Sequence, residues 1–115
     1  MRSINRTALL FQPKQPFIDW LNENEESGYV YRIDERRNDA GLFLIEEVKS
    51  ISEIRNLIDD QFTYFFELAL DKYPFSKETW PDISNFMVFE KWMDFTYHTI
   101  VEDMCDLPLS RESDY

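Results

Sequence analysis

The chain has 115 residues, of which 23 are acidic and 12 are basic, so its formal net charge is −11 at pH 7. A field of this sign repels phosphate backbones and anionic lipid surfaces, which disfavours binding to nucleic acids or to membranes. Hydrophobic residues form 43% of the chain and aromatic residues 17%. This content excludes a disordered chain and predicts one folded domain over residues 1–115.

The acidic residues are dispersed rather than gathered in runs, a pattern typical of a solvated surface. A basic protein partner, or mimicry of nucleic acid by an acidic face, is compatible with the same charge. The single cysteine, Cys105, cannot close an internal disulfide, and its acidic neighbours disfavour a reactive thiolate. No apolar run is long enough to span a membrane. We therefore expect a cytoplasmic protein.

Residues 4–12 form an apolar run that Pro13 stops, which predicts a first strand. Pro16 suits the first turn of a helix, and four apolar residues at helical spacing follow it before the polar stretch 22–28. They are Phe17, Ile18, Trp20 and Leu21. Residues 29–33 alternate aromatic and aliphatic types and predict a second strand. A charged turn over residues 34–41 leads to a third strand at residues 42–48.

The strongest periodic signal predicts one helix over residues 51–72. Ser50 and Glu53 match a capping box at its start. The apolar residues recur at three- and four-residue steps: Ile54, Leu57, Ile58, Phe62, Phe65, Phe66, Ala69 and Leu70. The main loop is expected at residues 75–82, which contain Trp80 and Pro81.

The last third of the chain supports two interpretations. Apolar residues keep helical spacing from Phe86 to Met104, but residues 95–101 are almost all strand-favouring types. We therefore expect a short helix over residues 83–91 and a strand over residues 93–102. Residues 107–115 are expected to be a flexible tail.

The predicted order of elements is β-α-β-β-α-β with a short extra helix before the last strand. This is the α+β, ferredoxin-like arrangement, in which two helices cover one face of a four-stranded sheet. If the last segment is helical instead, three strands and three helices remain.

His98 is the only histidine, and Asp94 and Glu102 lie four residues to either side of it. On a helix such neighbours are about 6 Å apart and could share a proton or a metal. On a strand they are roughly 13 Å apart and cannot touch. The strand interpretation places Asp94 and His98 on a polar sheet face, so a catalytic site would need a carboxylate from elsewhere, with Asp19 the first candidate. One histidine is too little for a zinc site, and no motif indicates a cofactor.

Three residues are candidates for a binding site. Lys14 lies where the first strand meets the first helix, a place where backbone N–H groups can hold an anion. Trp20 and Trp92 could line an aromatic pocket together with Trp80, or these tryptophans could equally seal an edge of the core under the main loop.

Two strings of the sequence resemble a family of small uncharacterised bacterial proteins. The first is Ala-Leu-Leu-Phe-Gln-Pro-Lys-Gln-Pro-Phe-Ile-Asp-Trp-Leu-Asn at residues 8–22, and the second is Trp-Met-Asp-Phe-Thr-Tyr-His at residues 92–98. The resemblance spans most of the chain and implies no activity. It adds interest to Lys14, Asp19, Trp20, Asp94 and His98.

Taken together, these features predict a small acidic binding or protein-interaction domain, with a protein partner or a second copy contacting its sheet. The lack of an assembled catalytic motif favours binding over catalysis. The alternative is a small enzyme or metal-binding protein that uses His98 with nearby carboxylates.

Overall fold

The computed structural model describes residues 2–34 and 41–110, which combine helices and strands in one α+β unit. Their elements in chain order are β1 (Arg2–Ser3), β2 (Arg6–Pro13), α1 (Gln15–Asn24), β3 (Gly41–Glu46), α2 (Ile51–Leu70), a short 3-10 helix (Lys77–Thr79), α3 (Phe86–Trp92), β4 (Met93–His98) and β5 (Glu102–Asp103). The predicted α+β class is confirmed. No helix in the described part is long and apolar enough to cross a membrane.

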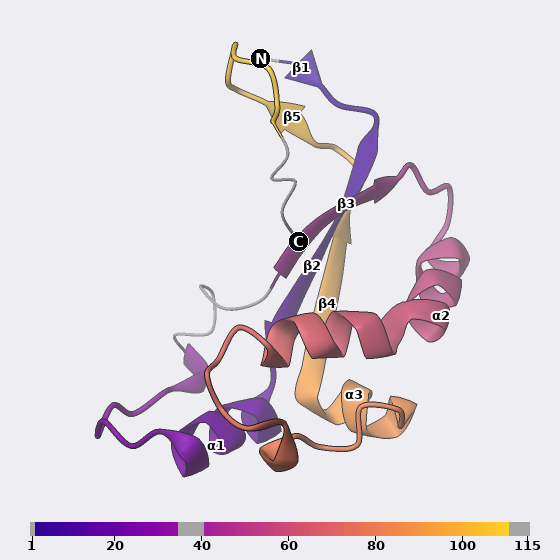
Figure 1. The fold of residues 1–115 in the computed structure, drawn as a ribbon. Coiled ribbons are helices and arrows are strands. Elements are labelled where there is room, and N and C mark those ends of the chain that lie inside the picture. The colour runs from indigo at the N-terminus through magenta and orange to yellow at the C-terminus, as the bar shows by residue number, and fades with distance from the viewer. Residues whose placement is uncertain (1, 35–40, 111–115) are drawn as a thin grey trace.

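The main sheet has three strands in the order β3-β2-β4, and both pairings are antiparallel. The central strand of this sheet is therefore β2, in which Leu9 lies opposite Phe43 of β3 on one side and Tyr97 of β4 on the other. Beyond one end of this sheet, β1 and β5 pair as a small separate ribbon (Figure 1).

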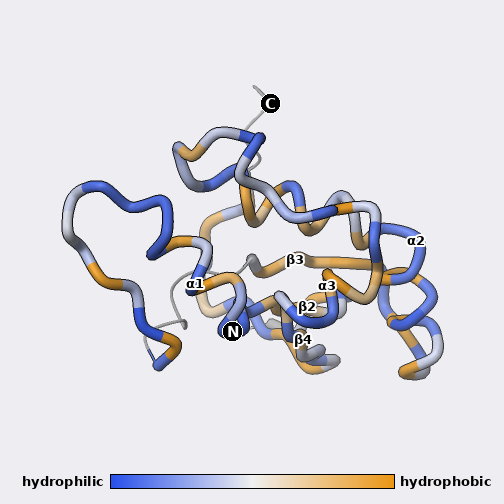
Figure 2. Tube along the Cα trace, turned by 90° about the horizontal axis from the view of Figure 1, so that it is seen from below, coloured by the Kyte–Doolittle hydropathy of each residue, from blue (hydrophilic) through white to orange (hydrophobic). Residues whose placement is uncertain are grey.

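The helices α2 and α3 cover the same face of the sheet. Phe11 on β2 is 2% exposed and contacts Phe65 of α2 and Phe89 of α3. In Figure 1, α2 runs across the strands while α1 and α3 lie near one end of them. On the opposite face, Leu42 and Leu44 of β3 are 63% and 47% exposed. Figure 2 shows the hydrophobic character of β3 as an orange tube beside β2.

The periodic helix predicted for residues 51–72 is confirmed as α2, and every apolar residue named for its buried face is buried or half-buried. Its start differs in detail from the predicted capping box. The Ser50 side chain makes no capping bond, whereas Glu53 Oε2 accepts the Lys49 N–H at 3.1 Å. The Glu53 carboxylate thus binds the N–H of Lys49, one residue before the Ser50 N–H that the capping box predicts.

The predicted second strand at residues 29–33 is wrong, because these residues form no strand. Two side-chain bonds explain the difference. Asn22 Oδ1 accepts the Tyr31 N–H at 2.8 Å, and Asn22 Nδ2 donates to the Tyr31 carbonyl at 3.0 Å. One amide on α1 therefore occupies both backbone groups of Tyr31 that a strand partner would need. The four-stranded ferredoxin-like sheet is accordingly not confirmed.

The last third is a helix followed by a strand, as predicted, rather than one helix. Asn85 caps α3 by accepting the N–H groups of Met87 and Val88, and the backbone is already extended at Met93. The strand is shorter than expected, since it ends at His98 and Ile100 is 81% exposed. Residues 107–110 are exposed and irregular, while the charged turn at 35–40 and the tail beyond 110 lie outside the described residues.

Phe66 offers a direct test of the core. It is fully buried, with its ring 5.5 Å from that of Phe89 and 5.8 Å from that of Trp92. Phe66→Ala should lower the free energy of unfolding by about 3–5 kcal/mol, because it leaves a cavity beside two rings that α3 holds in place. Urea denaturation followed by tryptophan fluorescence measures this loss. The exposed neighbour Glu67→Ala is the control and should change stability by less than about 0.5 kcal/mol. Equal effects of the two changes would contradict this core.

A second test concerns how residues 29–33 are held on α1. The Tyr31 hydroxyl donates to Glu25 Oε1 at 2.8 Å, and this bond is the main cause that lowers the pKa of Glu25 below its ordinary value of 4.5. Tyr31→Phe should therefore raise the pKa of Glu25. Because a lowered pKa stabilises the fold only where the carboxyl is ionised, the stability difference between the two proteins should be present at neutral pH and vanish as the pH falls below 4.5.

Carboxyl-carbon NMR titration reports the Glu25 pKa, and chemical denaturation at several pH values reports the stability difference. Tyr29→Phe is the matched control, since the bond to Glu25 comes from Tyr31. An unchanged Glu25 pKa in Tyr31→Phe would show that the hydroxyl does not hold the carboxylate in solution.

Candidate functional site

The polar sheet face predicted for the last strand is present. Asp94, Thr96 and His98 alternate along β4 and lie opposite Gln12, Leu10 and Ala8 of β2. Since positions four apart on a strand are roughly 13 Å from each other, Asp94 and His98 do not meet. Phe95 on the other face is half-buried, whereas Tyr97 is 38% exposed where the helices no longer cover the strand.

The structure does not gather the candidate catalytic residues. His98 is exposed and its Nε2 lies 3.1 Å from Thr96 Oγ1, while Asp94 Oδ1 accepts the N–H of Phe95. Asp19 is exposed on α1 and accepts a bond from Gln15 at 2.8 Å. Within residues 2–34 and 41–110, no three His, Cys, Asp or Glu side chains are grouped so that they could hold a metal ion. The arrangement thus lends no support to acid–base or metal chemistry at His98.

Lys14 joins two helix ends rather than presenting an anion site. Its backbone N–H donates to the carbonyl of Trp92 at 2.7 Å, and its Nζ donates to the carbonyl of Glu90 at 2.7 Å. These carbonyls belong to the last turn of α3, which has no further intrahelical donors for them. The lysine charge also suits a helix C-terminus. Its role in this geometry is to fasten α3 to the β2–α1 junction.

Trp20 is a core residue, and the partly buried Trp92 packs against the core at the same junction. Trp20 is 4% exposed, and its Nε1 donates to the Thr79 carbonyl at 3.0 Å. Both indole rings contact Phe17, with ring centroids 5.4 and 5.8 Å away. The predicted grouping with Trp80 does not form, because Trp80 lines a separate small hollow beside Tyr64 and Lys77.

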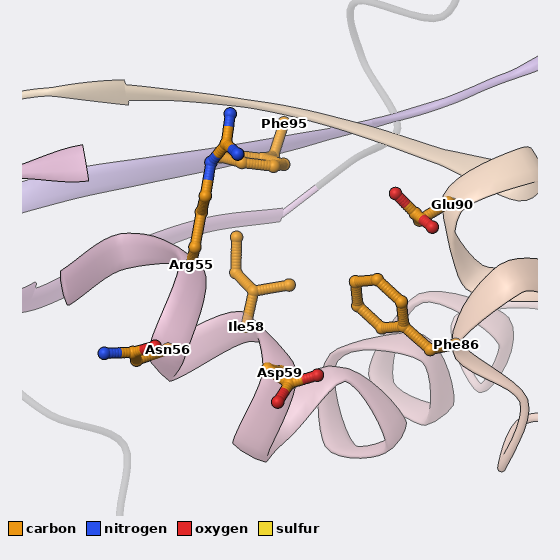
Figure 3. A pocket seen from close by; sticks show the side chains of 7 residues that line it. All are labelled: Arg55, Asn56, Ile58, Asp59, Phe86, Glu90 and Phe95. Atoms are coloured by element: carbon orange, nitrogen blue, oxygen red, sulfur yellow. The ribbon is translucent and has the colours of Figure 1, made fainter. Parts of the chain in front are cut away.

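The structure instead places a pocket where α2, α3 and β4 meet (Figure 3). Its volume is about 420 Å³, within the range of small-molecule sites. The side chains that line it are Arg55, Asn56, Ile58, Asp59, Phe86, Glu90 and Phe95. Its apolar part comes from all three elements, so no single segment of the sequence forms the pocket.

Charged side chains of both signs stand around this apolar part. Arg55 and Asp59 lie one turn apart on α2, and Glu90 on α3 points into the space between the elements (Figure 3). Within the described residues these three side chains form no hydrogen bond and no ion pair with one another. Their charges therefore remain available to a ligand at the rim of the pocket.

Sequence reasoning did not identify this pocket. Only the α2 side of the pocket has a signal in the sequence: Arg55 and Asp59 lie on either side of Ile58, at the border of the buried face of α2. Nothing in the sequence places Glu90 or Phe95 against that border. A comparison of the chain with protein-family models, curated proteins and solved structures finds no match. The resemblance drawn from residues 8–22 and 92–98 therefore stays a prediction.

The structural role of Trp20 can be tested by replacing its indole with a smaller ring that has no N–H. Trp20→Phe keeps an aromatic ring but leaves the Thr79 carbonyl without the donor that it has at 3.0 Å. The free energy of unfolding should fall by about 1–3 kcal/mol. Thermal and urea unfolding followed by circular dichroism measure the change, with the half-exposed Tyr64→Phe as control. Full stability of Trp20→Phe would point to a free indole with another purpose.

Proposed function

We propose that this protein is a non-catalytic binding domain and that the pocket between α2, α3 and β4 holds its ligand. The ligand class is a compact molecule with an aromatic or branched aliphatic body and a polar head that carries both an amine and an acceptor group. The single observation that carries the proposal is a set of charged side chains, unpaired with one another among the described residues, around a partly apolar pocket of ligand size.

The apolar body of the ligand would pack on Ile58, Phe86 and Phe95. Ile58 is 3% exposed and both phenylalanines are half-buried, so these side chains provide a fixed hydrophobic surface rather than a loose one. Phe86 is further held by Phe62, whose ring lies 5.2 Å away at 80°. Burial of an aromatic body on such a surface contributes on the order of 25 cal/mol for each Å² removed from water.

The charges define the polar head of the ligand. An ammonium group can bind Glu90, which points into the pocket, and the net charge of −11 attracts cations from a distance. A carboxylate or another acceptor fits Arg55, whose guanidinium can donate two parallel hydrogen bonds. The pocket is therefore complementary to a zwitterion such as an amino acid with an aromatic side chain.

The lining also favours binding over catalysis. It includes no hydroxyl, thiol or imidazole, the usual nucleophiles and bases of small enzymes. Asp59 and Glu90 are exposed, and an exposed carboxylate binds a cation readily but lacks the desolvated surroundings that acid catalysis uses.

The test is titration of the ¹⁵N-labelled protein with three probes: L-phenylalanine, phenethylamine and 3-phenylpropionate. The first two should shift the amides of residues 55–59 and 86–95, while phenylpropionate, which lacks the amine, should bind about tenfold more weakly. Glu90→Gln should weaken both amines by about fivefold or more. Arg55→Gln should weaken L-phenylalanine but leave phenethylamine within about twofold, because only the amino acid carries a carboxylate.

Glu67→Gln is the matched control, since it removes one carboxylate from α2 outside this pocket. Two outcomes would overturn the proposal. One is the lack of saturable shifts with any amine. The other is binding that Glu67→Gln weakens as much as Glu90→Gln does, because binding would then follow the overall charge alone.

A further inference from the structure

We propose that the outer edge of β3 accepts an extended basic segment of a partner protein as an added strand. This interaction is independent of the pocket, which lies on the β4 side of the sheet. All six residues of β3 pair with β2, and no other described residue pairs with β3. The outer edge of such a strand presents alternating N–H and C=O groups that another strand can bind.

In the predicted ferredoxin-like arrangement, a strand occupies the position beside the outer edge of β3. In the β-α-β-β-α-β arrangement, the first strand lies between the third and the last, and the second strand lies outside the third. Here β2, β3 and β4 take the first, third and last positions, all antiparallel. The segment predicted as the second strand is held on α1 by Asn22 instead. No described residue therefore occupies the place of that strand.

The edge also lacks the usual protection against pairing. Natural edge strands carry lysine, proline or bulges that block another strand. The sequence of β3 is Gly-Leu-Phe-Leu-Ile-Glu, with no proline or basic residue and a single charge at its end. Leu42 and Leu44, 63% and 47% exposed, lie on the sheet face without helices. An added strand would place its own apolar side chains next to these two leucines.

The charge of the chain identifies the occupant. Two copies of a protein with net charge −11 repel each other, and six paired residues extend over only about 20 Å, too little for a stable dimer interface by themselves. A basic segment is attracted by the same charge. Glu46 and the exposed Glu47 stand at one end of β3, where lysine or arginine flanking an added strand would meet them. The matching partner is thus an extended segment with alternating apolar residues and a basic flank that lies at the Glu46 end of β3.

The probe is a peptide, acetyl-Lys-Val-Thr-Val-Thr-Val-Lys-amide, added to the full-length ¹⁵N-labelled protein. Saturable shifts should appear in the amides of residues 41–46, and hydrogen exchange of the outward-facing amides should slow. A peptide with proline in place of the central valine, which cannot pair along its length, should bind about tenfold more weakly or worse. A peptide with glutamate flanks should lose affinity to a similar extent.

Variants of the protein separate pairing from general attraction. Leu44→Lys should weaken the basic peptide by about tenfold, and Leu42→Lys provides the same test if the first variant folds poorly. Met87→Lys is the control, because Met87 is 66% exposed on α3 and the charge change is identical. It should alter the affinity by about twofold at most.

Several results would overturn the inference. They are a peptide that leaves residues 41–46 unshifted, equal binding by the proline-containing peptide, and sedimentation data that show a dimer which Leu44→Lys converts to a monomer. The pocket probes shift the amides of residues 55–59 and 86–95, whereas the peptide shifts those of residues 41–46. A negative result at one site therefore leaves the result at the other site unchanged.

Discussion

The contacts of one side chain, Phe11, hold the layers of this protein together. Phe11 lies on the central strand, 2% exposed, and its ring is 4.8 Å from that of Phe65 on α2 and 5.9 Å from that of Phe89 on α3. It also contacts Phe43 on β3 and Phe95 on β4. Both flanking strands and two helices thus meet one ring, and interior packing at this density leaves little freedom for any of them to shift.

The functional features depend on this arrangement because they lie at its borders. Phe95 and Ile58 extend the core outward to the pocket, so the floor of the pocket is rigid while the charged groups at its rim are exposed. At the opposite border, Phe43 and Ile45 anchor β3 to the core through one face. Its other face and its outer edge remain open to a partner. A rigid support with an accessible border is the usual basis of selective binding, because little order is lost when the ligand arrives.

The residues that stood out in the sequence mostly serve this framework. Lys14 binds the carbonyl of Glu90 and Trp20 binds that of Thr79, so both join segments more than fifty positions apart in the chain. The bonds of these two residues hold α1 and α3 in place at the point where β4 begins. His98 stands apart, exposed at the end of β4 with Thr96 as its neighbour.

What the sequence determined by itself was the periodic structure. The buried stripe of α2, the proline-started α1 and the change from α3 to β4 follow from side-chain spacing and local preference, which act within a few residues. Tertiary structure decided the conformation of residues 29–33. Their sequence pattern favours a strand, but the Asn22 amide binds both backbone groups of Tyr31, so no strand forms. It also decided the pocket, since Arg55 and Glu90 approach each other only when α2 and α3 pack on the same sheet. Local spacing carries no information about such approaches, because they depend on which segments of the folded chain become neighbours.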